Sequence, residues 1–304
     1  MSLSLRTRFI RKVLRNAFKK QRLTIKKNRT RSATIARFTN HPPKGVDIIK
    51  FEIDGIRAGW IVPTGAEQDK VILHLHGGGY VTGGLDSHQA MCILMAQTLK
   101  TRVLIPEYRL APENPFPAAL EDALKVYRWL LAIGQQPGNI IISGDSAGGG
   151  LGLATVLSLR DAGEPLPAAV VCMSPWTDLT FTGQSHHAKA KAEAMLQEDD
   201  LREWASCYIG KENPKNPLIS PIYADFHGFP PLLIQVGSEE ILLEDARLLA
   251  EKAEADGVDV TLRIWEGLWH VWQILGNLIP ESLAAFEQEG KFFQEHAISF
   301  INPK

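Results

Sequence analysis

The chain has 304 residues, of which 45% are hydrophobic and 22% charged, and its formal net charge is −1 at pH 7. These values are ordinary for a globular protein, show no overall bias toward nucleic acid, and fit one large α/β domain with an added subdomain. Three cysteines without CxxC spacing argue against a disulfide framework and a thiolate metal site. No apolar run approaches the ~18 residues of a membrane-spanning helix, and the N-terminus lacks the apolar core of a secretory signal, so we expect a cytoplasmic protein.

The near-neutral total conceals a basic N-terminal segment. Residues 1–46 hold 14 of the 33 Lys and Arg residues and no Asp or Glu, so the remainder is acidic. The stretch from Leu5 to Lys20 has helical periodicity, with its apolar residues on one face. We expect this helix to pack on the domain as part of a cap. A helix that binds an anionic membrane surface is the less favoured alternative.

Strand and helix patterns alternate along the rest of the chain. Apolar runs at residues 46–53 and 56–62 flank Asp54-Gly55, which predicts a hairpin. Further strands are expected at residues 70–76, 102–106, 139–143, 168–173, 232–236 and 260–265, and helices at 87–99, 118–133, after 147, 242–255 and 282–296. This alternation predicts an α/β fold with a mostly parallel central sheet of about eight strands and helices on both faces.

One long stretch, residues 178–220, interrupts the alternation. Residues 188–209 look helical, and a helical excursion above a parallel sheet is a natural cap. We therefore divide the chain into an N-terminal part of the cap (1–46), a first part of the α/β core (47–178), a cap insertion (179–217) and a second part of the core (218–304). The side chains predicted to line a substrate pocket are Tyr80, Met195, Trp204 and Tyr208. The alternative is that such cap residues only form the cap's own small core.

The most informative feature is the pentapeptide Gly144-Asp145-Ser146-Ala147-Gly148. It follows an apolar strand pattern and precedes a run of small residues that is compatible with a helix. This context predicts a sharp strand-to-helix turn that exposes the Ser146 hydroxyl at the edge of the sheet. Ser146 is therefore a candidate nucleophile for acyl transfer.

A serine nucleophile needs a base to take its proton and an acid to orient that base. On this kind of sheet the partners follow in the order Ser, Asp or Glu, His. His270 follows the last strand by a short loop, at the carboxyl edge where ligands collect, whereas His296 lies inside the terminal helix pattern. We therefore predict that His270 is the general base.

The acid should follow the strand at residues 232–236. Of the four carboxylates there, Glu244 and Asp245 lie a turn into the next helix and are expected to face water. Glu239 and Glu240 stand at the helix start and can reach back to the histidine. Asp178 is a weaker competitor.

A glycine loop, His76-Gly77-Gly78-Gly79-Tyr80, follows the strand at residues 70–76. Consecutive glycines let backbone N–H groups approach a ligand without hindrance, which predicts donors for a tetrahedral oxyanion. A phosphate cradle is disfavoured because no Gly-Lys-Ser/Thr helix start follows. The N–H of Ala147, directly after the nucleophile, is a further expected donor. We expect His76 to orient the loop.

Four motifs in this order resemble those of the hormone-sensitive-lipase family of α/β hydrolases, the bacterial family IV carboxylesterases. They are the glycine loop, the stretch from Tyr108 to Ala119, the serine pentapeptide with Gly149, and Ser174-Pro175-Trp176-Thr177-Asp178-Leu179. The likeness runs from about residue 50 to residue 275. It implies the α/β-hydrolase fold, a helical cap, and hydrolysis of small acyl esters without a cofactor.

Carried over residue by residue, the resemblance implies that Ser146 is the nucleophile and His270 the base. It further implies that the oxyanion donors are Gly77, Gly78 and Ala147. The acid position falls on Glu240, two residues before Leu242. The commoner family pattern has aspartate and then proline there, and Glu239 is the nearest alternative.

These patterns predict a serine carboxylesterase for short- to medium-chain acyl esters. We expect a small-molecule ester as its partner and no cofactor, metal or nucleic acid. An amidase, lactonase or deacetylase on the same triad, a non-catalytic binding protein on this scaffold, and a membrane-surface lipase are the alternatives. Pairing of edge strands could also produce a homodimer.

Overall fold

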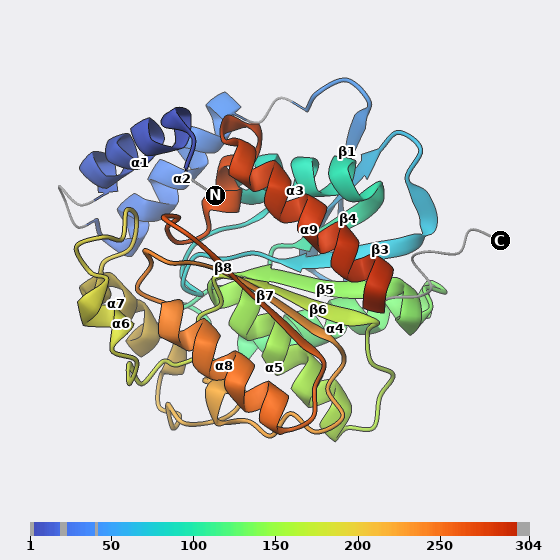
Figure 1. The fold of residues 1–304 in the computed structure, drawn as a ribbon. Helices are drawn as coiled ribbons and strands as arrows, with labels where there is room; N and C mark the ends of the chain where they lie inside the picture. The colour runs from blue at the N-terminus through green and yellow to red at the C-terminus, as the bar shows by residue number, and fades with distance from the viewer. Residues whose placement is uncertain (1–2, 19–22, 40–41, 297–304) are drawn as a thin grey trace.

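The computed structural model describes residues 3–18, 23–39 and 42–296. At its centre lies an eight-stranded sheet in the order β1-β2-β4-β3-β5-β6-β7-β8 (Figure 1). The strands are β1 (Val46–Ile53), β2 (Ile56–Pro63), β3 (Glu67–Leu75), β4 (Thr101–Pro106), β5 (Ile140–Asp145), β6 (Ala169–Met173), β7 (Leu232–Gly237) and β8 (Val260–Trp265). Strands β3 to β8 are parallel, and β1 and β2 join them as an antiparallel hairpin. The predicted fold class is confirmed.

The helices cover both faces of this sheet. They are α1 (Leu5–Phe18), α2 (Ile25–Thr39), α3 (Leu85–Leu99), α4 (Ala118–Ala132), α5 (Ala147–Asp161), α6 (Ser185–Ala188), α7 (Glu198–Ile209), α8 (Leu243–Ala255) and α9 (Pro280–His296). Helices α3 and α9 pack on one face, and α4, α5 and α8 on the other. Because the central strands are covered on both sides, β5 to β7 are buried along their whole length.

The hairpin turn has the geometry that its sequence favours. Asp54 and Gly55 both have positive φ, 44° and 87°, as a two-residue turn between twisted strands requires. This hairpin lies at one edge of the sheet, and β8 forms the other edge.

The segment that we propose as the cap insertion differs from the sequence prediction in one stretch. The continuous helix expected over residues 188–209 is wrong, because the chain runs through turns after α6 and α7 begins only at Glu198. The physical reason is a local side-chain contact. One carboxylate oxygen of Glu193 accepts the backbone N–H groups of Met195 and Leu196, at 2.7 and 3.4 Å. These bonds compete with a helical ladder.

Helix α1 is anchored to the body by its inner face. Ser4 N–H and the Thr7 hydroxyl donate to the Glu281 carboxylate, and Ile10 and Leu14 pack against an apolar cluster that includes Trp269 and Trp272. In Figure 1, α1 and α2 lie beside α6 and α7 at one end of the sheet. This neighbourhood supports our proposal that residues 1–46 and 179–217 form one cap. Within the described ranges, no helix combines the length and hydropathy needed to cross a membrane.

Helix α5 crosses the sheet so closely that Gly148 has no room for a side chain. A Cβ atom at Gly148 would lie 1.9 Å from the carbonyl oxygen of Leu75 and 2.6 Å from that of His76. At Gly152, one turn later in the same helix, an added Cβ would meet only a methyl group of Ile142, at 3.2 Å.

We therefore predict that Gly148→Ala lowers the free energy of unfolding by about 1–3 kcal/mol, since backbone must shift to admit the methyl group. Gly152→Ala serves as the matched control. It should be neutral or stabilising, because alanine favours a helix interior by roughly 0.5–1 kcal/mol over glycine. Urea unfolding of both variants measures the difference. Equal effects of the two substitutions would contradict the close approach.

Candidate active site

Ser146 sits at a strained turn between β5 and α5. Its backbone has φ 54° and ψ −122°, a region that costs a non-glycine residue about 1–3 kcal/mol. The turn is held by a hydrogen bond from Ser146 N–H to the Met173 carbonyl on the neighbouring strand, at 2.9 Å. The serine side chain is thereby fixed at the carboxyl end of the sheet, as the pentapeptide predicts.

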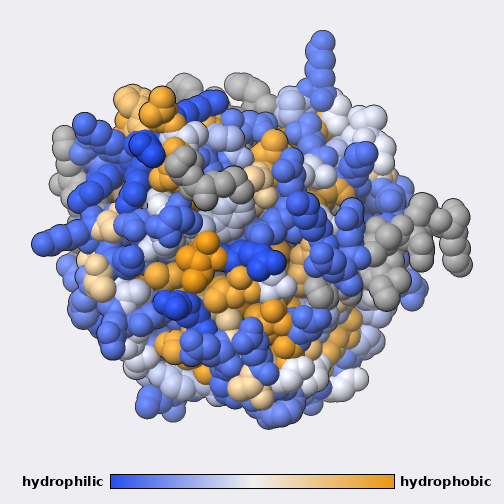
Figure 2. Space-filling view, viewed as in Figure 1, coloured by the Kyte–Doolittle hydropathy of each residue, from blue (hydrophilic) through white to orange (hydrophobic). Residues whose placement is uncertain are grey.

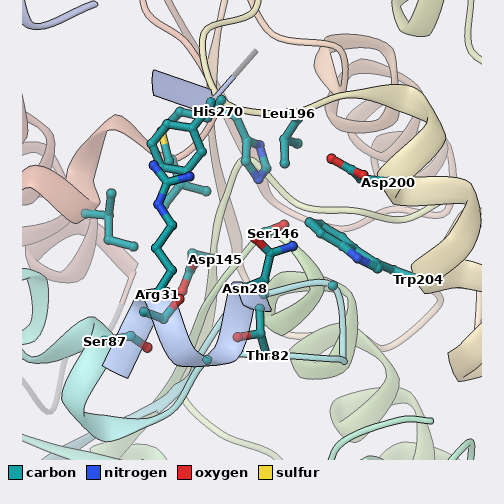
Figure 3. A pocket seen from close by; sticks show the side chains of 18 of the residues that line it. Asn28, Arg31, Thr82, Ser87, Asp145, Ser146, Leu196, Asp200, Trp204 and His270 are labelled. Carbon is teal, nitrogen blue, oxygen red and sulfur yellow. The ribbon is translucent and has the colours of Figure 1, made fainter. Parts of the chain in front are cut away.

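A cavity of about 190 Å³ opens over Ser146 (Figure 3). Its floor comes from the core, and its other walls come from both parts of the proposed cap. The N-terminal segment contributes Phe18, Leu23, Asn28 and Arg31; the insertion contributes Met195, Leu196, Asp200 and Trp204. The guanidinium of Arg31 lies 4.1 Å from the centre of the Phe18 ring, which ties α2 to the end of α1 beside the cavity.

His270 also lines this cavity and is held by Glu240. The distance from His270 Nδ1 to Glu240 Oε2 is 2.9 Å, and the Glu240 side chain is completely buried. The other carboxylate oxygen, Oε1, accepts the Ser174 hydroxyl at 2.8 Å and the Gly237 N–H at 2.5 Å. Ser174 Oγ in turn accepts the N–H of Val271 at 3.0 Å. One connected set of hydrogen bonds therefore holds Glu240 together with the loop that carries His270 and Val271, which we call the histidine loop.

The competing carboxylates point elsewhere. Glu239 pairs with Arg11 and Lys189 at 3.3 and 3.8 Å and is about a quarter exposed. Asp178 accepts the N–H and hydroxyl groups of Thr180 and Thr182. Neither residue bonds to His270, so the geometry favours Glu240 as its partner.

The expectation that Glu244 and Asp245 face water is wrong. Glu244 is half-buried and accepts the N–H of Ser185. Asp245 is buried, accepts the N–H groups of Thr177 and Asp178, and lies 3.3 Å from His186 Nε2. The first turn of α8 packs against the connection that follows β6, which hides this side of the helix from solvent.

The environment of His270 raises its pKa above the ordinary value. Burial lowers the pKa, but the hydrogen bond and charge of Glu240 outweigh it, with smaller contributions from the charges of Glu193 and Asp145. The imidazole is therefore poised to gain a proton during a reaction.

Ser146 and His270 face the same cavity without a direct bond between them. Both are described residues, and no hydrogen bond joins the Ser146 hydroxyl to the imidazole in this structure. Contacts of this kind are often long in a free enzyme and shorten once substrate is bound. The structure thus places the Ser146 side chain and the His270 imidazole at the same cavity.

The prediction that Gly77 donates to an oxyanion is wrong, because its N–H is already used. It donates to Asp145 Oδ1 at 3.0 Å. The same carboxylate accepts from His74 Nε2 at 3.1 Å and from His88 Nε2 at 3.3 Å. Burial raises the pKa of Asp145, but the two histidines outweigh it and hold the pKa well below its usual range. Asp145 is therefore a buried anion that fixes the start of the glycine loop.

Gly78 and Gly79 are the two glycines of the loop that line the cavity. Both have positive φ, 117° and 62°, a conformation that glycine adopts without strain. Ala147 is the first residue of α5, so its N–H has no acceptor within the helix. The structure thus places Gly78 and Gly79 on the cavity wall and Ala147 directly after Ser146 in the chain.

His76 behaves as the expected loop-orienting residue. Its Nδ1 lies 2.8 Å from the Gly77 carbonyl oxygen, and its ring stacks on that of Tyr108 at 4.1 Å. The Tyr108 hydroxyl donates to the His76 carbonyl at 2.6 Å. Burial lowers the pKa of His76 to about 3, so the ring is neutral.

Two of the four predicted pocket residues reach the cavity. Met195 and Trp204 line it, and the Trp204 indole packs directly over Gly79. The prediction is wrong for Tyr80 and Tyr208, which do not line the cavity. Both are buried, and they stack on each other with ring centres 3.6 Å apart. The positive φ of Tyr80, 62°, turns its side chain back toward α5.

Glu193 is a site residue that the sequence patterns missed. Its carboxylate is fully buried, and Oε2 accepts the backbone N–H of His270 at 3.3 Å. Burial raises the pKa of this carboxyl group. Glu193 thereby joins the insertion to the histidine loop. No local signal marks it, since the two residues lie 77 positions apart.

Comparison with known proteins agrees with this geometry. Residues 72–274 match the family described as alpha/beta hydrolase fold. An acetyl-hydrolase from Streptomyces hygroscopicus is 45% identical over 78% of this chain and 79% of its own length. An esterase from Acinetobacter venetianus is 36% identical over 81% of this chain and 82% of its own length.

A solved structure matches almost the whole chain. The crystal structure of an esterase from the bacterial hormone-sensitive lipase family superposes with a TM-score of 0.93 at 41% identity, covering 98% of this chain and 100% of that one. Fold, sequence and site geometry agree, and the chain thus belongs to the α/β hydrolases and, among them, to the hormone-sensitive-lipase family.

Proposed function

We propose that this protein is a serine carboxylesterase that works through an acyl-enzyme. The observation that carries the proposal is the buried Glu240–His270 pair opening onto the same cavity as the strained serine. The reactive set is Ser146, His270 and Glu240, with the N–H groups of Gly78, Gly79 and Ala147 as the oxyanion hole.

In the proposed reaction, the Ser146 oxygen attacks the ester carbonyl carbon while His270 Nε2 takes the hydroxyl proton. Glu240 holds Nδ1–H and stabilises the imidazolium that forms. The three backbone N–H groups donate hydrogen bonds to the negatively charged former carbonyl oxygen. His270 then gives its proton to the leaving alcohol. Water, deprotonated by the same imidazole, cleaves the acyl-enzyme and restores the serine.

The cavity favours a small acyl group. Its volume of about 190 Å³ lies below the roughly 300–1,000 Å³ of pockets for drug-sized ligands. Its side walls include the apolar side chains of Phe18, Leu23, Leu196 and Trp204. We therefore propose esters of short acyl chains as substrates, and the name of the acetyl-hydrolase relative supports this size class.

We also propose an oligomeric state and a cellular compartment for this protein. In the eight-stranded sheet β8 pairs with β7 alone, and Ile264 on β8 is 44% exposed. An outer strand edge of this kind can pair with a second copy, which supports a homodimer. We keep the cytoplasm as the proposed compartment.

The first test is Ser146→Ala. The substitution should lower kcat for p-nitrophenyl acetate by at least about 10⁴-fold, because the nucleophile is gone. It should also abolish labelling by a fluorophosphonate probe, while the melting temperature stays near that of the wild type. Undiminished turnover, or labelling of another residue, would refute the assignment of Ser146.

The second test separates two adjacent glutamates. Glu240→Gln should lower kcat/KM roughly 10³- to 10⁴-fold, because the amide no longer holds the required imidazole tautomer. Glu239→Gln is the matched control and should change the rate by less than about threefold, since it removes only partly exposed ion pairs. Steady-state kinetics on one soluble ester measures both. The reverse ranking would move the acid role to Glu239.

The third test is the pH dependence of kcat/KM. The base must be neutral, and its pKa in the folded protein lies above its ordinary value of 6.5. Activity should therefore fall as the pH drops through an inflection above 6.5. In Glu240→Gln the raising influences of Glu240 are lost while burial remains, so the inflection of the residual activity should move to lower pH. An unmoved inflection would show that Glu240 does not act on this imidazole.

A further inference from the structure

The outer face of α1 carries a stripe of exposed apolar side chains. Leu5, Phe9 and Val13 are 83%, 68% and 49% exposed. They are spaced by four residues and so lie along one side of the helix. We call these three residues the α1 stripe.

The stripe is separate from the contacts that anchor the helix. Thr7, Ile10 and Leu14 face the body, where Thr7 is buried and the other two join the tryptophan cluster. The sequence pattern suggested one apolar face, but in the structure it divides into an inner part that packs and an outer part that does not. The stripe therefore contributes little to the folding of the chain.

Scattered apolar residues on a surface need no explanation, whereas an aligned group commonly marks an interaction site. Leu5 and Phe9 are the two most exposed large apolar side chains among the described residues. Figure 2 shows hydrophobic surface at the upper left, where Figure 1 places α1, with hydrophilic side chains beside it.

Positive charge surrounds the stripe. Arg6, Arg8, Lys12 and Arg15 are exposed on α1. Helical spacing places Arg6 and Lys12 on the two flanks of the stripe, and Arg8 and Arg15 farther round the helix. The sequence of residues 1–46 contains no Asp or Glu to offset them. Arg11, by contrast, turns inward and bonds to Gly267, Ala192 and Glu239. Two exposed basic side chains, Arg6 and Lys12, therefore flank the apolar ones.

We propose that the α1 stripe docks on the surface of an anionic lipid bilayer. An interfacial helix buries its apolar side chains at the boundary between headgroups and acyl chains. Long Lys and Arg side chains at its flanks then reach lipid phosphates. Both requirements are met by the outer face of α1.

The positive charge of α1 argues against a second copy of the chain as the partner that covers the α1 stripe. Two stripes packed face to face would bring two clusters of like positive charge together, which disfavours the contact. Phe18, the last residue of α1, lines the catalytic cavity. Docking would therefore hold the cavity close to the lipid surface without placing any residue of the reactive set in the bilayer.

The test is co-sedimentation of the full-length protein with vesicles. Wild type should bind vesicles that contain phosphatidylglycerol at least about tenfold more tightly than pure phosphatidylcholine vesicles, and salt at about 0.5 M should weaken the binding. The triple variant Leu5→Ser, Phe9→Ser, Val13→Ser should bind the anionic vesicles at least about tenfold more weakly.

A matched control replaces exposed apolar residues elsewhere. The double variant Ile133→Ser, Leu248→Ser removes side chains that are 49% and 37% exposed, directly after α4 and on α8, and its vesicle binding should equal that of wild type. All variants should keep the melting temperature and the turnover of a water-soluble ester.

Three results would overturn the proposal. The first is no binding of wild type to anionic vesicles, and the second is equal loss of binding in the triple variant and the control. The third is a change of molar mass in the triple variant by light scattering, which would make the stripe a contact between copies of the chain.

Discussion

The site depends on one buried anion, the carboxylate of Asp145. It accepts hydrogen bonds from His74 on β3, His88 on α3 and the N–H of Gly77 at the start of the glycine loop. Asp145 is also the residue directly before Ser146. One charge therefore fixes the turn at Ser146 and the glycine loop relative to each other. A buried charge is costly unless hydrogen bonds compensate it, and the Asp145 carboxylate accepts three.

The Glu240–His270 pair is likewise held in place by buried hydrogen bonds. Glu240 is buried among donors from β6, β7 and the histidine loop, and it leaves one oxygen for His270. Glu193 reaches the same loop from the insertion and accepts the His270 N–H. The position of the imidazole is thus coupled to the insertion, which forms part of the cavity wall. Hydrogen bonds from rigid strands and loops supply the preorganisation that acyl transfer requires.

Much of this could be predicted from sequence because the signals are local. The apolar run before Ser146 and the Asp54-Gly55 turn are read from a few neighbouring residues. What could not be predicted depends on contacts between distant segments. The N–H of Gly77 looks available until Asp145, 68 positions away, is seen to accept it. Likewise, only the packed structure shows that Tyr80 stacks on Tyr208 and that the apolar face of α1 is divided into an inner and an outer part.

The most direct test of this account is a crystal structure of the protein inactivated with a small phosphonate ester. The account predicts phosphorus bonded to Ser146 Oγ. The phosphoryl oxygen should then lie about 2.7–3.1 Å from the N atoms of Gly78, Gly79 and Ala147, while Gly77 N–H stays on Asp145. A phosphoryl oxygen directed away from the glycine loop, or a Gly77 N–H that leaves Asp145 to bind it, would contradict the account.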